Sequence, residues 1–334
     1  MSRRPRGRWA PTPSGWIHVG NARTALVVWL SVRSRGGSLI WRLEDLDPPR
    51  ALSGAADAAI FDLQWLGLDW DEGPALGGPH APYIQSLRYD FYEHALRQLA
   101  GSGHLFPCGR TRRELKELTM APHGSYGPST APYPTAWRPQ ILAPDWYERY
   151  LLKAETSSNS STVDALRFRV HEEPVTFIDG LQGEITERVD QTVGDFVLKR
   201  RDGLYAYQLA VVVDDIAMEV NEVVRGVDLL DSTARQIQLI EALGGEIPHY
   251  VHLPMVLNAE GEKLSKRDDG LTLRSLRDAG VMPEELVGYL AFSLGLLDRP
   301  VPCSPKELLD TFDLGRIRLE DWRLPENLAE QLLA

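Results

Sequence analysis

The opening stretch of the chain, residues 8–43, constrains the fold more than any other part of the sequence. It begins with a short strand, passes through a turn rich in proline and glycine, and enters a helix predicted over residues 22–35, which Gly36 and Gly37 end. The apolar run that follows, residues 38–43, is typical of a buried parallel strand. Strand, helix and strand in this order predict a βαβ unit and therefore a parallel α/β sheet.

The turn of this unit is a candidate anion site. It places His18 and Gly20 near the start of the helix, where free backbone N–H groups and the helix dipole favour a negative charge. Far downstream, residues 263–267 read Lys-Leu-Ser-Lys-Arg and can bring cations to the same anion. Both features also have a purely structural explanation, because a histidine can bond to the backbone of its turn and a basic hairpin can simply be solvated.

The rest of the chain predicts a second half of the sheet, separated from the first by an insertion. Residues 109–140 are rich in proline, glycine, serine and threonine, which indicates a subdomain with much loop. Residues 196–200 and 204–213 are expected to form a hairpin, so that 209–213 are a buried strand ending at Asp214 and Asp215. The other expected elements are helices over residues 53–66, 86–99 and 232–243 and strands over residues 166–170, 175–179, 183–189, 222–226 and 252–257.

These elements predict a Rossmann-like parallel sheet with a β-rich insertion and a small C-terminal helical domain. The first half of the sheet is expected within residues 1–105, the insertion within 106–190, the second half within 191–258 and the helical domain, with the basic loop at its start, within 259–334. The carboxylates of residues 44 and 45 directly follow a parallel strand, at the edge where such sheets bind ligands.

Composition restricts the class of protein. The formal net charge of −11 counts mildly against a nucleic-acid-binding protein, although basic clusters such as residues 110–113 and 199–201 can still bind anions locally. Two cysteines far apart, Cys108 and Cys303, indicate a reducing compartment without a disulfide framework. No apolar run is long enough to cross a membrane, and the arginine-rich N-terminus lacks the apolar segment of a signal peptide. We therefore expect a cytoplasmic protein that does not bind membranes.

Five strings of residues resemble the class I aminoacyl-tRNA synthetases of the glutamate branch. In order, they are residues 8–25, Arg42-Leu43-Glu44-Asp45, residues 207–215, Val224-Arg225-Gly226 and residues 263–267. One string alone would be a weak signal, but five in the expected order over residues 7–270 make coincidence a poor explanation. The resemblance implies a class I catalytic domain that activates glutamate with ATP.

The resemblance also implies two groups of ligand-binding residues. Those expected to bind ATP are His18, Gly20, Asn21, Lys263, Ser265 and Lys266, of which His18, Lys263 and Lys266 are the catalytic ones. Those expected to bind glutamate are Arg8, Ala10, Thr12, Glu44, Tyr207 and Arg225.

Charge complementarity is consistent with this assignment. Glu44 is expected to bind the glutamate ammonium, and Arg8, Tyr207 and Arg225 to bind carboxylate oxygens, since arginine can hold a carboxylate through two hydrogen bonds. Tyr207 has an alternative explanation as an aromatic packed in the core of the hairpin. Asn21 departs from the family pattern, which often has histidine there, because an amide can donate a hydrogen bond but carries no charge.

The insertion departs from the family at its metal site. Related enzymes often hold zinc with Cys-x-Cys followed by Tyr and Cys, whereas this chain has, in these places, Cys108, Arg110, Tyr133 and Trp137. Zinc needs about four ligands, and neither His104 nor His123 has a compact ligand spacing with Cys108. We expect no structural zinc and no protein metal site, and we expect Mg²⁺ to bind with ATP, mainly through the phosphates.

Two features narrow the resemblance to members that attach glutamate to the queuosine base of tRNA(Asp). One is Asp47-Pro48-Pro49-Arg50 directly after the Glu-Asp pair, and the other is the short segment after residue 267, where full glutamyl-tRNA synthetases carry a large anticodon-binding domain. The expected partners are L-glutamate, ATP and tRNA(Asp) bearing queuosine, and a monomer is expected. Two alternatives stay open: a truncated glutamyl-tRNA synthetase-like ligase with a different acceptor, and a non-catalytic RNA-binding paralogue.

Overall fold

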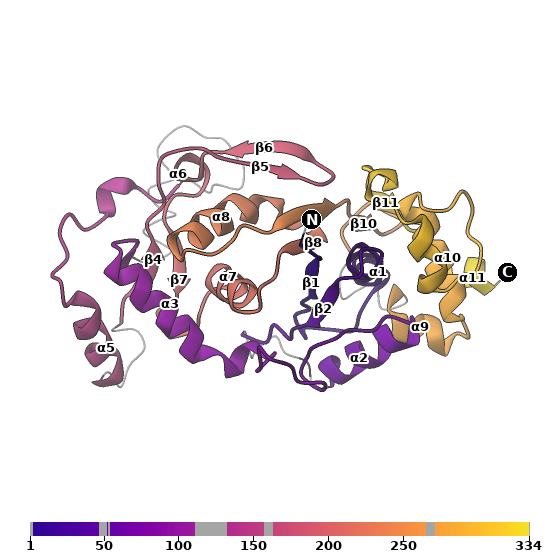
Figure 1. The fold of residues 1–334 in the computed structure, drawn as a ribbon, viewed down its shortest axis with the longest axis horizontal. Helices are drawn as coiled ribbons and strands as arrows, with labels where there is room; N and C mark the ends of the chain where they lie inside the picture. Colours follow the sequence, from indigo (N-terminus) through magenta and orange to yellow (C-terminus); the bar gives the residue numbers. More distant parts are fainter. Residues whose placement is uncertain are drawn as a thin grey trace.

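A computed structural model describes residues 3–46, 52, 54–110, 132–156, 163–264 and 271–333 (Figure 1). At its centre is a six-stranded sheet in the order β2-β1-β8-β9-β5-β6. These strands are β2 (Ser38–Trp41), β1 (Arg6–Trp9), β8 (Glu222–Gly226), β9 (His249–Leu253), β5 (Val175–Asp179) and β6 (Gly183–Glu187). Within this sheet all neighbours pair in parallel except β5 and β6. The predicted α/β class with a Rossmann-like parallel sheet is confirmed.

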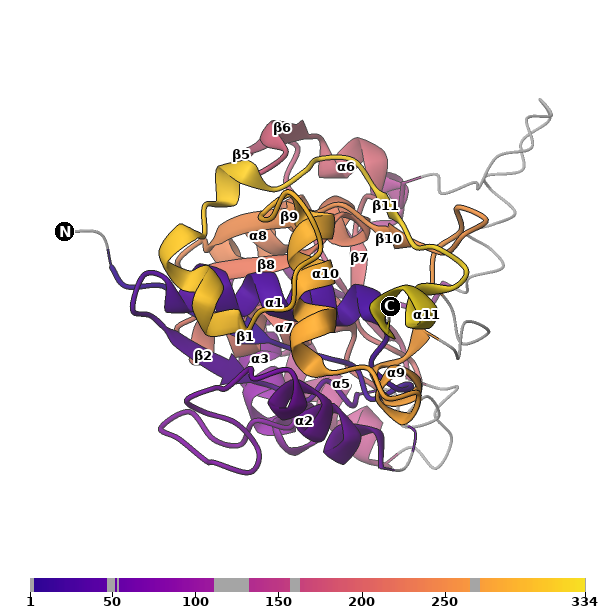
Figure 2. The ribbon, with the colours of Figure 1, turned by 90° about the vertical axis from the view of Figure 1, so that its right-hand side faces the viewer.

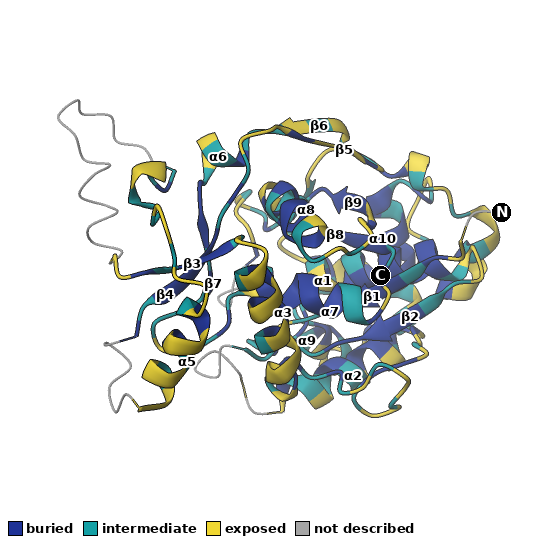
Figure 3. Ribbon diagram, turned by 60° about the vertical axis from the view of Figure 1, so that its left-hand side comes forward, coloured by how far each residue is buried: buried dark blue, intermediate teal, exposed yellow. Residues whose placement is uncertain are grey.

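Helices cover both faces of this sheet. On one face, α1 (Val19–Arg33) packs against β1, β2 and β8. On the other lie α7 (Tyr207–Ala217) and α8 (Thr233–Ala242), with α3 (Tyr89–Gly101) packed on α7. Successive strand residues point to opposite faces, so Val224 joins the core around α1 and Val223 joins the core around α7. The central strands and α1 are accordingly buried, whereas α3 has an exposed outer side (Figure 3).

The prediction of a buried strand over residues 209–213 is wrong, because these residues lie in α7. The strand before them, β7 (Phe196–Lys199), is followed only by an isolated bridge between Lys199 and Tyr205, after which the chain turns into the helix. An apolar run of this length cannot be distinguished by periodicity from a helix buried on most sides. Residues 209–215 are all buried between the sheet and its neighbouring helices, which leaves no polar stripe to reveal the helical period.

A small antiparallel sheet combines strands near and within the predicted insertion with β7, which follows the insertion in the chain. Its strands follow the order β3-β4-β7, with β3 spanning Leu105–Cys108 and β4 spanning Ala165–Phe168. The strands predicted over residues 175–179 and 183–189 are present as β5 and β6, but they extend the main sheet through the pairing of β5 with β9. The domain boundaries at residues 105, 190 and 258 stay predictions.

The C-terminal segment packs onto the same face of the sheet as α1 (Figure 2). It contains α9 (Leu273–Asp278), α10 (Pro283–Leu294) and α11 (Leu328–Leu333), and β11 (Trp322–Arg323) pairs with β10 (Val256–Leu257). The other helices in the described residues are α2 (Ala55–Trp65), α5 (Trp146–Thr156), α6 (Val189–Thr192) and the short 3-10 helices η2 (Gln85–Leu87), η3 (Thr135–Trp137), η5 (Val227–Ser232), η7 (Pro305–Thr311) and η8 (Leu314–Arg316). None of the helices described has the length and hydropathy needed to span a membrane.

Candidate active site

A cavity of about 990 Å³ opens at the carboxyl ends of β1, β8 and β9, the edge where parallel sheets bind ligands. Its wall contains every predicted site residue that lies within the described part of the chain: Arg8, Ala10, Thr12, His18, Gly20, Asn21, Glu44, Tyr207, Arg225 and Lys263. Ser265 and Lys266 lie outside the described residues, as do residues 47–50. Strands and loops far apart in sequence thus bring the two predicted groups of residues to one place.

The turn before α1 is built around His18. Its Nδ1 atom accepts a hydrogen bond from the backbone N–H of Asn21 at 3.3 Å, which caps the helix and explains why it begins at Val19 rather than at residue 22. The imidazole also lines the cavity, so His18 has both the structural and the ligand-facing position. A Cβ on Gly20 would lie 3.1 Å from the His18 ring, so glycine leaves room for the ring at the helix start.

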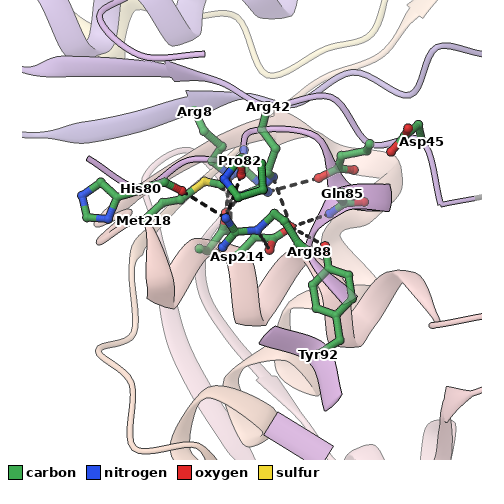
Figure 4. A network of polar contacts seen from close by, with 12 residues as sticks. Arg8, Arg42, Asp45, His80, Pro82, Gln85, Arg88, Tyr92, Asp214 and Met218 are labelled. Atoms are coloured by element: carbon green, nitrogen blue, oxygen red, sulfur yellow. Dashed lines mark hydrogen bonds and ion pairs between the residues drawn. The ribbon is translucent and has the colours of Figure 1, made fainter. Parts of the chain in front are cut away.

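A network of buried charges includes Arg8 and Glu44 of the cavity wall. Figure 4 shows the part of this network around Arg42 and Asp214. Asp215 on α7 accepts hydrogen bonds from Arg42 Nη1 at 2.7 Å and from Arg8 Nε at 3.3 Å. Arg42 in turn donates from Nη2 to Glu44 Oε1 at 3.1 Å. Burial raises the pKa of Glu44, and the positive charges of Arg42 and Arg8 only partly offset this rise. Glu44 therefore gains from a further cation placed beside it in the cavity.

The neighbouring Asp214 ties α7 to α3 and to the segment before it. It accepts hydrogen bonds from Arg88 Nε at 2.6 Å, Gln85 Nε2 at 2.8 Å and Tyr92 Oη at 3.0 Å. The side chains of Asp214 and Arg88 are completely buried. The strings that carry the family resemblance contain Arg42, Asp214 and Asp215 but give these residues no role. Nothing in the sequence marks Arg88.

Arg225, at the end of β8, has a different environment. Its guanidinium donates to His252 Nε2 at 2.9 Å, Gln236 Oε1 at 2.8 Å and Thr233 Oγ1 at 2.9 Å, and the residue is only 5% exposed. Tyr207, the first residue of α7, is 38% exposed and also lines the cavity. This placement excludes the alternative that Tyr207 is packed in the core.

Lys263 also lines the cavity. It follows β10 and forms a bridge with Leu257. Its ammonium pairs with Asp228 of η5, and its side chain is 64% exposed. An exposed ion pair of this kind contributes at most about 1 kcal/mol, so Lys263 can exchange Asp228 for a more strongly charged ligand such as a phosphate group.

The residues at the family's zinc positions do not fit zinc in this chain. Cys108 Sγ lies 3.3 Å from Tyr133 Oη, but the guanidinium of Arg110 lies over the ring of Trp137, 4.9 Å from its centroid. Neither a guanidinium nor an indole offers a ligand for zinc. Across the described residues, no group of three or more His, Cys, Asp or Glu side chains is placed to hold a metal ion. His123 lies outside the described part.

Comparisons with known proteins extend over nearly the whole chain. Residues 5–297 match the family of class I tRNA synthetases (E and Q), catalytic domain. A glutamyl-Q tRNA(Asp) synthetase of Symbiobacterium thermophilum is 48% identical over 96% of this chain and 95% of its own length. A second one, of Nitratidesulfovibrio vulgaris, is 42% identical over 98% of both chains.

Longer relatives also match. Glutamate–tRNA ligase 2 of Syntrophus aciditrophicus is 39% identical over 94% of this chain but only 63% of its own length. Among solved structures, a glutamate tRNA ligase from Elizabethkingia meningosepticum, in complex with its amino acid, superimposes with a TM-score of 0.83 at 29% identity. That match covers 99% of this chain and 69% of the ligase.

Proposed function

Because the chain belongs to the glutamate and glutamine branch of the class I tRNA synthetases, we propose that it activates L-glutamate with ATP and transfers the glutamyl group to the queuosine base of tRNA(Asp). The observation that carries the activation step is the single cavity whose wall contains Glu44, Arg225, His18 and Lys263 together. The acceptor is supported by the two relatives named glutamyl-Q tRNA(Asp) synthetase, which match over nearly their full length.

Each charge of glutamate has an opposite charge available in this cavity. The ammonium binds beside Glu44, whose buried carboxylate needs a further cation. The carboxylates bind the guanidinium groups of Arg8 and Arg225 and the hydroxyl of Tyr207, while Ala10 and Thr12 line the pocket between them.

Activation is attack of a glutamate carboxylate oxygen on the α-phosphorus of ATP, with pyrophosphate as the leaving group. Negative charge builds up on the phosphate oxygens, so catalysis consists mainly of positioning and electrostatic stabilisation. His18 and the backbone at Gly20 hold these oxygens at the start of α1, and Asn21 adds a neutral donor. Lys263 brings an ammonium group to these oxygens, and the resemblance to the family assigns the same role to Lys266 and a supporting role to Ser265. Mg²⁺ accompanies ATP and neutralises the phosphates.

Transfer assays test the acceptor directly. Labelled glutamate is offered with ATP to three RNAs: tRNA(Asp) bearing queuosine, tRNA(Asp) lacking it, and tRNA(Glu). Transfer to the first alone is expected. Transfer to tRNA(Glu) would favour the truncated glutamyl-tRNA ligase instead, and the absence of any glutamate-dependent ATP–pyrophosphate exchange would favour the non-catalytic RNA-binding protein.

Lys266→Ala tests the basic loop. We expect a decrease in glutamate-dependent ATP–pyrophosphate exchange of about 100-fold or more, because the variant lacks a cation aimed at transition-state charge. The thermal unfolding midpoint should change little. The matched control is Lys306→Ala at η7, outside the cavity wall, which should leave exchange unchanged. Wild-type exchange in Lys266→Ala would refute the assignment.

A further inference from the structure

The two buried arginines on the cavity wall differ in their partners. Arg8 shares the carboxylate of Asp215 with Arg42, so a protein anion already lies against its charge. Arg225 donates to the ring of His252, the amide oxygen of Gln236 and the hydroxyl of Thr233, which are neutral groups. No carboxylate within the described residues forms an ion pair with it. A buried guanidinium with neutral partners keeps its charge available for an anionic ligand.

The contact between Arg225 and His252 is one link in a chain across three adjacent strands. His252 on β9 lies beside Arg225 on β8, and its Nδ1 is 2.6 Å from Asp179 Oδ2 at the end of β5. Asp179 is held in place by the backbone N–H groups of Leu181 and Gln182, both at 3.0 Å. Asp179 is 2% exposed and His252 is 0% exposed.

The carboxylate determines the direction of these hydrogen bonds. An ionised carboxylate can only accept, so Asp179 keeps the imidazole proton on Nδ1. Nε2 then has a free lone pair and accepts from Nε–H of Arg225 at 2.9 Å. The opposite tautomer would place an N–H against an N–H and would push the guanidinium away from its observed position.

The surroundings of His252 favour this neutral form. Burial lowers the pKa of His252 and the nearby charge of Arg225 lowers it further, while the carboxylate of Asp179 acts in the opposite direction. The groups that face the ring are Asp179 from β5, Arg225 from β8, Arg8 from β1 and Tyr250, whose ring stacks on it with centroids 6.1 Å apart. Burial acts to raise the pKa of Asp179, but the hydrogen bonds from His252 and from the backbone outweigh this effect and lower the pKa.

We infer that Asp179 and His252 are positioning residues for substrate recognition: they orient Arg225 toward the cavity, where its charge binds a carboxylate of glutamate. Neither residue lines the cavity, so both act through Arg225. The inference deepens the proposed function and rests on glutamate being the substrate. Asp179, at the carboxyl end of β5, lies within the predicted insertion. The inference therefore gives this end of β5 a role in binding the amino acid.

The test measures KM for glutamate and KM for ATP separately by ATP–pyrophosphate exchange with the full chain. His252→Leu removes the acceptor for Arg225 and should raise the glutamate KM by about 10-fold to 100-fold, with the ATP KM within about twofold of wild type. His252→Gln restores an acceptor oxygen near the position of Nε2 and should recover most of this loss. Asp179→Asn should also raise the glutamate KM, because an amide can donate to Nδ1 and move the proton to Nε2.

A pH profile separates positioning from simple structural support. In the wild type, the glutamate KM should rise as the pH falls through the acid side of the histidine range, below about pH 6.5. In His252→Gln this rise should be absent, because the titrating ring is gone. The control is Asp195→Asn, another buried aspartate, which bonds Arg138 at 2.7 Å and does not line the cavity. It should lower stability without a selective change in glutamate KM.

A glutamate KM in His252→Leu within about twofold of wild type would overturn the inference, and so would an equal rise in both KM values. If His252→Leu does not fold, Asp179→Asn decides, and an unchanged glutamate KM there would overturn it. A wild-type protein whose exchange does not depend on glutamate would refute the proposed function instead, so the two failures are distinguishable.

Discussion

At the scale of single residues, the cavity depends on buried charges that share partners. Asp215 is the centre of this arrangement, because it contacts both Arg8 and Arg42, and Arg42 holds Glu44. Burial acts to raise the pKa of Asp215, but the charges and hydrogen bonds of the two arginines outweigh this effect. The pKa of Asp215 therefore lies below its usual value, and the carboxylate stays ionised. A buried ion pair contributes little net stability when complete but costs much when one member is removed.

Asp215→Asn should therefore lower the free energy of unfolding by about 3–5 kcal/mol. It should also raise the glutamate KM, because Arg8 and Arg42 lose the anion that holds both guanidinium groups in position. Urea unfolding and exchange kinetics measure the two effects. The control, Asp145→Asn, breaks an exposed pair with Arg149 and should change stability by less than about 1 kcal/mol. Equal stability of Asp215→Asn and the control would contradict the role of the network.

At the scale of elements, one carboxylate joins α3, α5 and β7. Glu93 on α3 accepts hydrogen bonds from Tyr147 of α5 at 2.7 Å, from Lys199 of β7 at 3.1 Å and from Tyr205 at 3.2 Å. Burial acts to raise the pKa of Glu93, but these partners outweigh it and lower the pKa overall. The ionised form is thus stabilised in the folded protein.

Glu93→Gln should lose this stabilisation and its pH dependence. A depressed carboxyl pKa stabilises the fold at pH values above the unfolded-state pKa, near 4.3, and the contribution disappears as the pH falls through the lower folded-state pKa. We expect the unfolding free energies of wild type and variant to differ by about 1–3 kcal/mol at pH 7 and to converge below about pH 4. Glu148→Gln, which breaks the exposed pair with Arg97, should track the wild type at every pH.

The residues of the insertion also predict that the protein holds no structural zinc. The side chains of Arg110 and Trp137 contact each other and offer no zinc ligand, so zinc should be far below one atom per chain in purified protein by elemental analysis. Dialysis against a chelator, followed by restoration of Mg²⁺, should leave exchange activity unchanged. Stoichiometric zinc, or activity that returns only with zinc, would show that ligands from elsewhere complete a site.

At the scale of the whole molecule, the C-terminal segment and the first helix share one hydrophobic core. Arg23 of α1 is buried and donates to Ser293 of α10 at 3.1 Å and to the carbonyl of Pro254 at 3.0 Å. Gly288 on α10 lies so close to the following loop that an added Cβ would be 1.9 Å from the carbonyl oxygen of Val301. The parts should unfold as one unit.

Gly288→Ala should accordingly lower the free energy of unfolding by about 1–3 kcal/mol through overpacking, and the unfolding should stay a single transition by both near- and far-ultraviolet circular dichroism. Gly101→Ala is the matched control at the end of α3, where an added Cβ meets nothing within 4 Å. It should be neutral or stabilising by up to about 1 kcal/mol. A wild-type midpoint for Gly288→Ala, or two separate transitions, would contradict a common core.

The sequence by itself determined the βαβ unit, most strands and helices, and the residues around the cavity. These depend on local periodicity, on a turn whose chemistry is local, and on strings of residues that keep their order. The tertiary structure decided what depends on neighbours in space. The run over residues 209–213 is a helix whose period the sequence does not reveal, because the helix is buried on most sides. Asp179, Arg225 and His252 meet only because β5, β9 and β8 are adjacent in the sheet. Burial and charge pairing follow strand order, which no local pattern encodes.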